Sequence, residues 1–196
     1  MRIGIAGYMG AGKSTCARTF SGFDTIVIDA DTEAKLLMQS DLKVQFHLKE
    51  AFGESVVDND TICFRELGLK AFFSVDTLLT LNKIVHPPLV KHLEPIIFNN
   101  ENTNCILDAA LIPLLNIESW FDLCIWVDLP FEIRSKRLKA KRSDIEETEL
   151  HRRMRLQEEM MPVPQNKHWV KLPDSECGQY IRNRLEMKTP DVKGEG

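Results

Sequence analysis

The sequence predicts an α/β fold in which helices cover both faces of a five-stranded parallel sheet, giving three layers. Short apolar runs alternate with longer helical patterns, and a glycine-rich loop joins the first run to a helix. The runs are continuously apolar, which is typical of parallel strands buried on both faces. Strand and helix in alternation indicate a doubly wound sheet, which binds its ligands beyond the carboxyl ends of the strands.

Five apolar runs are the expected strands. Each is rich in Val, Ile or Leu and too short for a helix, and the fifth run is the weakest. The runs are RIGIAG (2–7), TIVIDA (25–30), NCILDA (104–109), LCIWVDL (123–129) and HWVKL (168–172).

Two helical segments interrupt the predicted core. Residues 31–103 are helix-rich without a clear strand, and we expect a helical insertion there. Residues 131–157 hold two basic helical stretches, and we expect a helical lid. We therefore predict a single domain over residues 1–188, followed by a disordered polar tail over residues 189–196. The core of that domain comprises residues 1–30, 104–130 and 158–188.

Composition narrows the classes of protein. The chain has 196 residues, of which 43% are hydrophobic, which is enough for a sizeable core. A net charge of -4 does not favour nucleic-acid binding, and we find no apolar run of the roughly 18 residues that a membrane span needs. Five widely spaced cysteines without a CxxC argue against a disulfide framework or a zinc site. We expect a protein of the reduced cytoplasm.

The loop GYMGAGKS (7–14) satisfies the pattern GxxxxGK[ST] and stands between a predicted strand and a predicted helix. Its backbone N–H groups and the positive end of that helix are suited to holding phosphates. We expect Lys13 to reach the β- and γ-phosphates and Ser14 to ligate Mg²⁺. The motif predicts a P-loop fold that binds a nucleoside triphosphate. The residues expected to hold the nucleotide are Gly10, Ala11, Gly12, Lys13, Ser14 and Thr15.

Three acidic residues end predicted strands at the same edge of the sheet. Asp29 and Asp31 follow the second strand, where one carboxylate could accept the proton of an attacking hydroxyl and the other help to hold hydrated Mg²⁺. We favour Asp31 for catalysis or substrate binding and Asp29 for the metal. Asp31 also suits the N-cap of the helix at 32–38, and the two roles are compatible. Asp108 ends the third strand, near the metal and the acceptor.

Arginine and lysine concentrate after the fourth predicted strand. In a lid that closes over the triphosphate, guanidinium groups would steady the transferring phosphoryl group. We favour Arg142 and Arg153 for this role, with Arg142 in contact with the nucleotide. The alternative is a solvated, charged helical face. The string NKHW (166–169) lacks the aspartate of the guanine-reading NKxD motif, which weakens the interpretation as a GTPase switch.

Taken in order, these motifs resemble those of the dephospho-CoA kinase family. The motif LNxIxHP inside the predicted insertion is more specific than the others, which are common among P-loop kinases. The matching segments are GYMGAGKST (7–15), VIDAD (27–31), AFGESVVDNDTICFREL (51–67), LNKIVHP (81–87) and DAALI (108–112), with Arg137, Arg142, Arg153 and Gln157 at lid positions.

The resemblance implies ATP-dependent phosphorylation of the ribose 3′-hydroxyl of dephospho-CoA, the last step of coenzyme A biosynthesis. It implies ATP and Mg²⁺, a small-molecule acceptor and no nucleic-acid or membrane partner, in a monomer or weak homo-oligomer. Lys13, Asp31 and Arg142 would be catalytic. His86 could instead be a core or capping histidine. The acceptor would contact Asp31, Arg65, His86, Asp108 and Arg153.

Three positions depart from the family pattern, and other functions stay open. Phe64 and Leu114 stand where acidic residues are frequent, and Pro173 lies where the family often has an asparagine-glycine turn. Shikimate kinase has a similar P-loop, but its Gly-Gly-Gly turn is replaced here by AALIP (109–113). A nucleoside monophosphate kinase would suit the basic lid equally. A regulatory nucleotide-binding protein without turnover is the alternative outside the enzymes.

Overall fold

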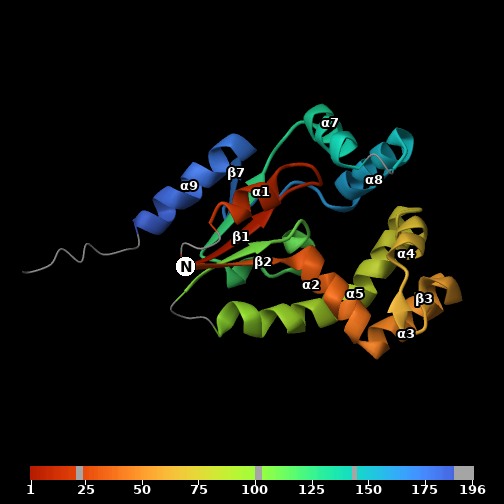
Figure 1. Cartoon of the computed structure of the whole chain (residues 1–196). Helices are drawn as coiled ribbons and strands as arrows, with labels where there is room; N and C mark the ends of the chain where they lie inside the picture. Colours follow the sequence, from red (N-terminus) through yellow and green to blue (C-terminus); the bar gives the residue numbers. More distant parts are fainter. Residues whose placement is uncertain (21–23, 100–102, 143–144, 188–196) are drawn as a thin grey trace, which may run out of the picture.

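The structure is a computed structural model that describes residues 1–20, 24–99, 103–142 and 145–187, and Figure 1 shows its course. The predicted tail at 189–196 lies outside these ranges. All five predicted strands are present, and each differs from its predicted bounds by two residues or fewer at either end. They are β1 (Arg2–Ala6), β2 (Thr25–Asp29), β5 (Asn104–Asp108), β6 (Leu123–Val127) and β7 (Trp169–Leu172).

These strands form one parallel sheet in the order β2-β5-β1-β6-β7. The order reverses direction at β1, so the loop after β1 opens at the topological switch point where doubly wound sheets bind ligands. Alternate residues of each strand point to opposite faces, as the period of two requires. Ile3 and Ile5 of β1 belong to one buried cluster, whereas Ala6 belongs to the other.

Helices cover both faces of the sheet (Figure 1). On one face, α1 (Lys13–Arg18) and α9 (Asp174–Glu186) contribute Ala17 and Ile181 to the core. On the other face, α5 (Val75–Phe98) and α6 (Ile112–Leu115) contribute Leu93 and Ile112. The predicted three-layer arrangement is therefore confirmed.

The predicted insertion has its own small core. It contains α2 (Ala30–Ser40), α3 (Leu42–Phe52), the 3-10 turn η1 (Glu54–Val56), α4 (Phe64–Ala71) and the first half of α5. The buried residues Leu48, Val56 and Val85 pack together there. The long helix α5 joins this cluster to the sheet, because Val85 lies in the insertion core and Leu93 lies against the sheet.

The expectation of an insertion without strands is wrong in one detail. Strands β3 (Val57–Asp58) and β4 (Thr61–Ile62) pair antiparallel in a small hairpin. Asn59 and Asp60 form its turn with positive φ angles of 45° and 57°, a conformation that Asn and Asp adopt more readily than most residues. Strands of two residues are too short to show an apolar pattern in a sequence.

The predicted lid contains two packed helices, α7 (Phe131–Lys141) and α8 (Glu147–Met160), and a second 3-10 turn, η2 (Glu118–Trp120), precedes β6. Helix α8 also contacts α5, so the lid region touches the insertion. Within the described ranges, no helix combines the length and apolar character needed to cross a membrane.

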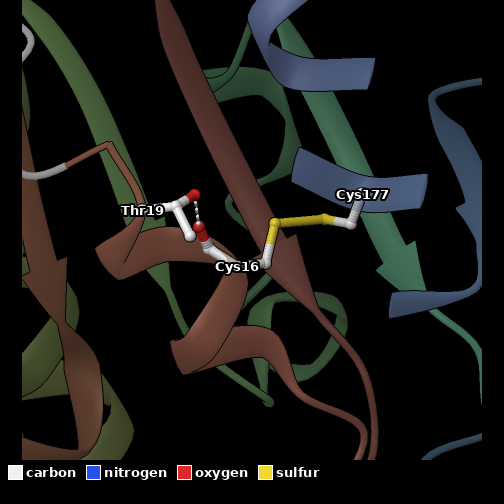
Figure 2. The surroundings of a disulfide bond; sticks show 3 residues. All are labelled: Cys16, Thr19 and Cys177. Carbon is white, nitrogen blue, oxygen red and sulfur yellow. Dashed lines mark hydrogen bonds between the residues drawn. A yellow bond between two sulfur atoms is a disulfide. The ribbon is translucent and has the colours of Figure 1, made fainter. Parts of the chain in front are cut away.

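The cysteine spacing argues against a disulfide framework, but the structure contains one disulfide. Cys16 of α1 and Cys177 of α9 form a disulfide (Figure 2). The two residues are 161 positions apart, and only the packing of α9 against α1 brings them together. Cys63, Cys105 and Cys124 are free. Burial raises the pKa of the Cys105 and Cys124 thiols to about 11 and about 12, which keeps both protonated at neutral pH.

Candidate active site

The loop after β1 has the geometry of a phosphate cradle. Gly10 and Gly12 have φ angles of 79° and 99°, which side chains other than glycine rarely adopt. A Cβ atom added at Gly10 would lie 2.9 Å from the carbonyl oxygen of Arg134, so the loop is also tightly packed. Helix α1 begins at Lys13, and no side chain caps its N-terminus within the described residues. Its first N–H groups are therefore suited to anionic oxygens.

Lys13 lies at the centre of the acidic edge. Its Nζ donates a hydrogen bond to the carbonyl oxygen of Tyr8 at 3.3 Å. Enclosure of the ammonium group within the protein lowers the pKa of Lys13, although the residue as a whole is half-buried, and the carboxylates of Asp108, Asp31 and Asp29 oppose that shift. The structure thus brings together four of the residues predicted for the site.

Asp29 caps α2, and this corrects the expectation for Asp31. The helix begins at Ala30, and Oδ1 of Asp29 accepts hydrogen bonds from the backbone N–H groups of Asp31 and Thr32 at 3.0 and 3.1 Å. The other Asp29 oxygen lies 3.9 Å from Nη2 of Arg18. Asp31 is consequently in the first helical turn with an exposed side chain. Its carboxylate is not used as the cap.

Asp108 and Ser14 are joined beneath the loop. Asp108 is 6% exposed and lies opposite Asp29 in the β2–β5 register. Burial raises the pKa of Asp108, while the hydrogen bond from Ser14 and the charge of Lys13 act in the other direction. The hydrogen bond from Ser14 and the charge of Lys13 therefore favour the ionised form of a carboxyl group whose pKa is raised by burial.

The oxygen atoms of Ser14, Asp29 and Asp108 are a chemically suitable set for Mg²⁺. Among the described residues, no cluster of three or more His, Cys, Asp and Glu side chains has metal-binding geometry. Mg²⁺ in nucleotide sites typically takes one or two protein oxygens and completes its shell with phosphates and water. Ser14 and the neighbouring carboxylates fit that mode of binding.

Three cavities meet at Asp31. The phosphate cavity encloses about 320 Å³ and is lined by Lys13, Ser14 and Asn82 as well as Asp31. The apolar cavity encloses about 120 Å³ and lies between α2, α5 and the segment after β5. The arginine cavity encloses about 440 Å³ between the insertion and the lid. Asp31 lines all three, so the three cavities adjoin at this residue.

The predicted cationic residues lie on the arginine cavity. Arg142 and Arg153 line it, and an adjoining hollow that shares both residues is also lined by Arg65. The structure thus brings these three together but separates them from His86. Lys35, which sequence reasoning missed, lines the arginine cavity together with Arg142 and Arg153.

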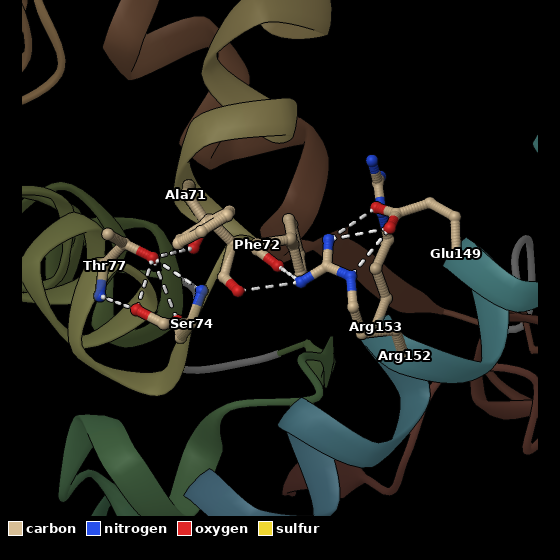
Figure 3. Close-up of polar contacts among 8 residues, drawn as sticks. Ala71, Phe72, Ser74, Thr77, Glu149, Arg152 and Arg153 are labelled. Carbon is tan, nitrogen blue, oxygen red and sulfur yellow. Dashed lines mark hydrogen bonds and ion pairs between the residues drawn. The ribbon is translucent and has the colours of Figure 1, made fainter.

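Arg153 is held in place by neighbours on two elements. Its Nε lies 2.6 Å from Oε1 of Glu149, and its guanidinium lies 5.1 Å from the centre of the Phe72 ring. Arg152, one residue earlier, donates hydrogen bonds to the backbone carbonyls of Phe72 and Phe73 (Figure 3). Helix α8 is therefore fastened to the end of α4 beside the arginine cavity.

His86 lines the apolar cavity. Its Nε2 is buried and has no hydrogen-bond partner among the described residues. Burial lowers the pKa of His86 to about 4, so the ring is neutral at pH 7. The ring is neither a cap nor a satisfied core histidine in this structure.

A further hollow on the outer side of the loop is suited to the remainder of a nucleotide. It encloses about 460 Å³ and is lined by Gly12, Thr15, Arg137 and Asp174 among others. Nη1 of Arg137 lies 2.7 Å from Oδ2 of Asp174, so the lid and α9 are joined at its rim. Pro173, one of the departures from the family pattern, directly precedes α9.

Sequence reasoning missed Arg134, which supports the loop from below. The residue is 1% exposed, forms an ion pair with Glu158 and donates to the backbone carbonyls of Leu129 and Met9. Oε1 of Gln157 accepts from the N–H of Met9 at 2.7 Å. Arg134 lies in a stretch rich in Lys and Arg, and nothing in the sequence distinguishes this buried residue from the exposed basic residues around it.

Comparisons with known proteins agree with this geometry. The family model described as dephospho-CoA kinase matches residues 1–167. The dephospho-CoA kinase of Corynebacterium diphtheriae is 35% identical over 157 residues, covering 78% of each chain. A solved protein from Thermus thermophilus has a TM-score of 0.69 at 24% identity, covering 97% of this chain and 98% of that one. The dephospho-CoA kinase of Campylobacter jejuni has a TM-score of 0.60 at 20% identity, covering 96% and 98%. The two solved structures support the fold.

Proposed function

The chain belongs to the dephospho-CoA kinase family, and from that premise we propose that it transfers the γ-phosphoryl group of ATP to the 3′-hydroxyl of dephospho-CoA. The position of Asp31 carries this proposal. A kinase must bring an acceptor hydroxyl, a base and the phosphate-binding loop together. Asp31 is on the wall of the phosphate cavity and of both cavities beside the insertion.

In this proposal, Asp31 accepts the proton of the 3′-hydroxyl as that oxygen attacks phosphorus. Its exposed carboxylate is not occupied by capping α2, because Asp29 performs that task. Asp29 has a primarily structural role, and one of its oxygens remains directed toward the cation Arg18. Asp31 is thus the proposed base, whereas Asp29 caps the N-terminus of α2.

Lys13, Ser14 and the loop amides position the triphosphate. Lys13 neutralises charge on the β- and γ-phosphates, and its neighbouring carboxylates oppose the lowering of its pKa by burial. Arg142 and Arg153 line the arginine cavity, which adjoins the phosphate cavity at Asp31, and from there they balance the charge that develops during transfer. Ser14 with Asp108 or Asp29 would hold Mg²⁺, and the ion would supply positive charge that stabilises the phosphates during transfer.

We further propose a cytoplasmic location, because the reaction consumes ATP, and a chain that acts as a monomer or weak homo-oligomer. Cytosolic thiols are largely kept reduced, so the Cys16–Cys177 bond would be subject to reduction there. No residue of the proposed site belongs to that pair.

Two substitutions test the assignment. Asp31→Asn preserves the shape of the side chain and removes the base, so kcat with dephospho-CoA should fall by a factor on the order of 10² to 10⁴ with little change in the KM of ATP. Lys13→Ala should cripple turnover by removing the charge that opposes the phosphates. If the Asp31→Asn enzyme loses affinity for ATP but keeps its kcat, Asp31 is not the base and instead has a structural role or helps to hold the metal.

A further inference from the structure

The phosphate-binding loop contains a tight turn whose middle peptide has two available orientations. The N–H of Ala11 donates to the carbonyl oxygen of Tyr8 at 3.1 Å, so residues 8–11 form a β-turn with Met9 and Gly10 at its centre. Gly10 has a φ of 79° and the φ of Met9 is not positive, which is the pattern of a type II turn. A type I turn has the same ends and differs by rotation of the Met9–Gly10 peptide. Glycine adopts positive and negative φ about equally readily, so Gly10 itself does not select between the two forms.

The orientation of this peptide decides what the loop presents to a phosphate. A trans peptide is planar, and its C=O and N–H groups point in opposite directions. The Met9 carbonyl accepts from Arg134, so the Gly10 N–H points away from Arg134. Gly10 lines both the phosphate cavity and the hollow on the outer side of the loop. The opposite orientation would present a carbonyl oxygen in place of that N–H group, and its partial negative charge would repel an anionic ligand.

Arg134 contacts three successive residues of this turn. Its guanidinium lies 5.0 Å from the centre of the Tyr8 ring. Its Nη1 donates to the carbonyl oxygen of Met9 at 3.4 Å. Its own carbonyl oxygen lies 2.9 Å from the place that a Cβ atom on Gly10 would occupy. One side chain and its backbone therefore hold the whole outer part of the loop.

The guanidinium of Arg134 is itself fixed by partners on other elements. The residue is 1% exposed, its Nε donates to the carbonyl oxygen of Leu129 at 2.9 Å, and it forms an ion pair with Glu158 of α8. Replacement of a buried ion pair by apolar side chains of similar size is often neutral or favourable for stability. Stability alone is therefore a weak reason for this pair. Its contact with the turn is a more specific one, because Gln157 of α8 also accepts from the N–H of Met9 at 2.7 Å.

We propose that Arg134 is a positioning residue for phosphoryl transfer, which holds the Met9–Gly10 peptide in the orientation that directs the Gly10 N–H toward the phosphates of ATP. Arg134 is not among the described residues that line the phosphate cavity, the arginine cavity or the outer hollow, so it acts through the loop rather than by contact with a substrate. The inference rests on the proposed function for the transfer step, whereas its effect on ATP binding involves no acceptor.

The test separates the role of the ion pair in folding from its effect on the loop. Arg134→Met/Glu158→Met removes both charges and leaves neither one unpaired, so its midpoint of urea unfolding should stay near the wild-type value. Its Kd for ATP, measured by calorimetry without an acceptor, should rise by about 10-fold, because the Gly10 donor is no longer held toward the phosphates. Its kcat with dephospho-CoA should fall by about 10- to 100-fold for the same reason, while the KM of dephospho-CoA should change by less than about twofold.

A matched control is available on the same two helices. Lys139 of α7 and Glu147 of α8 form an exposed ion pair that does not involve the loop. Lys139→Met/Glu147→Met should therefore keep the wild-type Kd for ATP and the wild-type kcat. If Arg134→Met/Glu158→Met also keeps both values, the buried pair only joins the helices and the inference is overturned.

A second variant decides the question if the double variant does not fold. In Arg134→Lys, the ammonium can pair with Glu158 but lacks the planar fork that serves Leu129 and Met9 together. Its Kd for ATP should rise by about threefold or more, and a wild-type Kd in this folded variant would overturn the inference. Wild-type protein that binds ATP without phosphorylating dephospho-CoA would contradict the proposed function alone, since the two Kd comparisons would still test the role of Arg134.

Discussion

At the scale of single residues, the carboxylates at the sheet edge show where sequence reasoning succeeds and stops. Their shared edge was predictable, because Asp29 and Asp108 are the last residues of parallel strands and Asp31 lies two residues beyond one of them. The identity of the cap was not, since Asp29 and Asp31 are two residues apart and either suits an N-cap. The choice depends on the extended backbone at Asp29, with φ -98° and ψ 104°. Pattern alone does not set those angles.

His86 should make the stability of the protein depend on pH. Its pKa is about 4 in the folded protein and close to 6.5 when the chain is unfolded, so the unfolded state binds the extra proton between these values. The free energy of unfolding should therefore fall as the pH is lowered from about 6.5 to about 4. Allowing for partial exposure of the ring, we expect a loss of about 1–2 kcal/mol from this group.

Urea unfolding of wild type and His86→Phe across that pH range measures the effect. The variant should lose less stability than wild type over the window, and His47→Phe, at an exposed position of α3, should follow the wild-type curve. Parallel curves for wild type and His86→Phe would contradict the burial assigned to this ring.

At the scale of elements, what could be predicted depends on how local the signal is. The five sheet strands were predictable because each is a continuous apolar run. The β3–β4 hairpin and the Cys16–Cys177 pair were not, because the first is only two residues per strand and the second depends on contacts between the two ends of the chain. The support of the loop by Arg134 also depends on packing that the sequence does not display.

The link between the lid and the insertion should govern acceptor binding. Arg152 of α8 donates to the carbonyls of Phe72 and Phe73 beside the arginine cavity. Arg152→Ala removes these charge-assisted bonds, so we expect the KM of dephospho-CoA to rise by about 5–10-fold, with the KM of ATP nearly unchanged. Arg155→Ala, at an exposed position on the same helix, is the matched control. Equal changes in the two KM values would show that Arg152 supports the whole site rather than this link.

The Cys16–Cys177 disulfide gives a second prediction at this scale. Thiol titration of the denatured protein, purified without reductant, should find three free thiols, those of Cys63, Cys105 and Cys124. Reduction should then lower the free energy of unfolding by a few kcal/mol, and by up to about 5 kcal/mol if chain entropy alone acts over so long a loop. Cys177→Ala should show no such sensitivity to reductant. Five titratable thiols in the untreated protein would contradict the pairing.

At the scale of the whole molecule, the sheet and the insertion meet around Asp31, where the three cavities adjoin. Helix α5 spans both cores, α8 fastens the lid to the insertion, and the P-loop opens at the switch point of the sheet. The predicted fold and family are confirmed. Both were predictable because the motifs that indicate them occur in order along the chain. The separation of the apolar cavity from the arginine cavity was not predictable. It depends on how α2, α5 and the lid pack around Asp31.

One measurement tests the central claim most directly. ADP release by the wild-type protein with Mg·ATP is compared for dephospho-CoA, shikimate and a panel of nucleoside monophosphates, and the position of the new phosphate is determined by nuclear magnetic resonance. The account predicts selective turnover of dephospho-CoA with the phosphate on the ribose 3′-oxygen. Turnover of shikimate or of a nucleoside monophosphate without turnover of dephospho-CoA would contradict it, and would show that the cavities around Asp31 accept a different alcohol or phosphate.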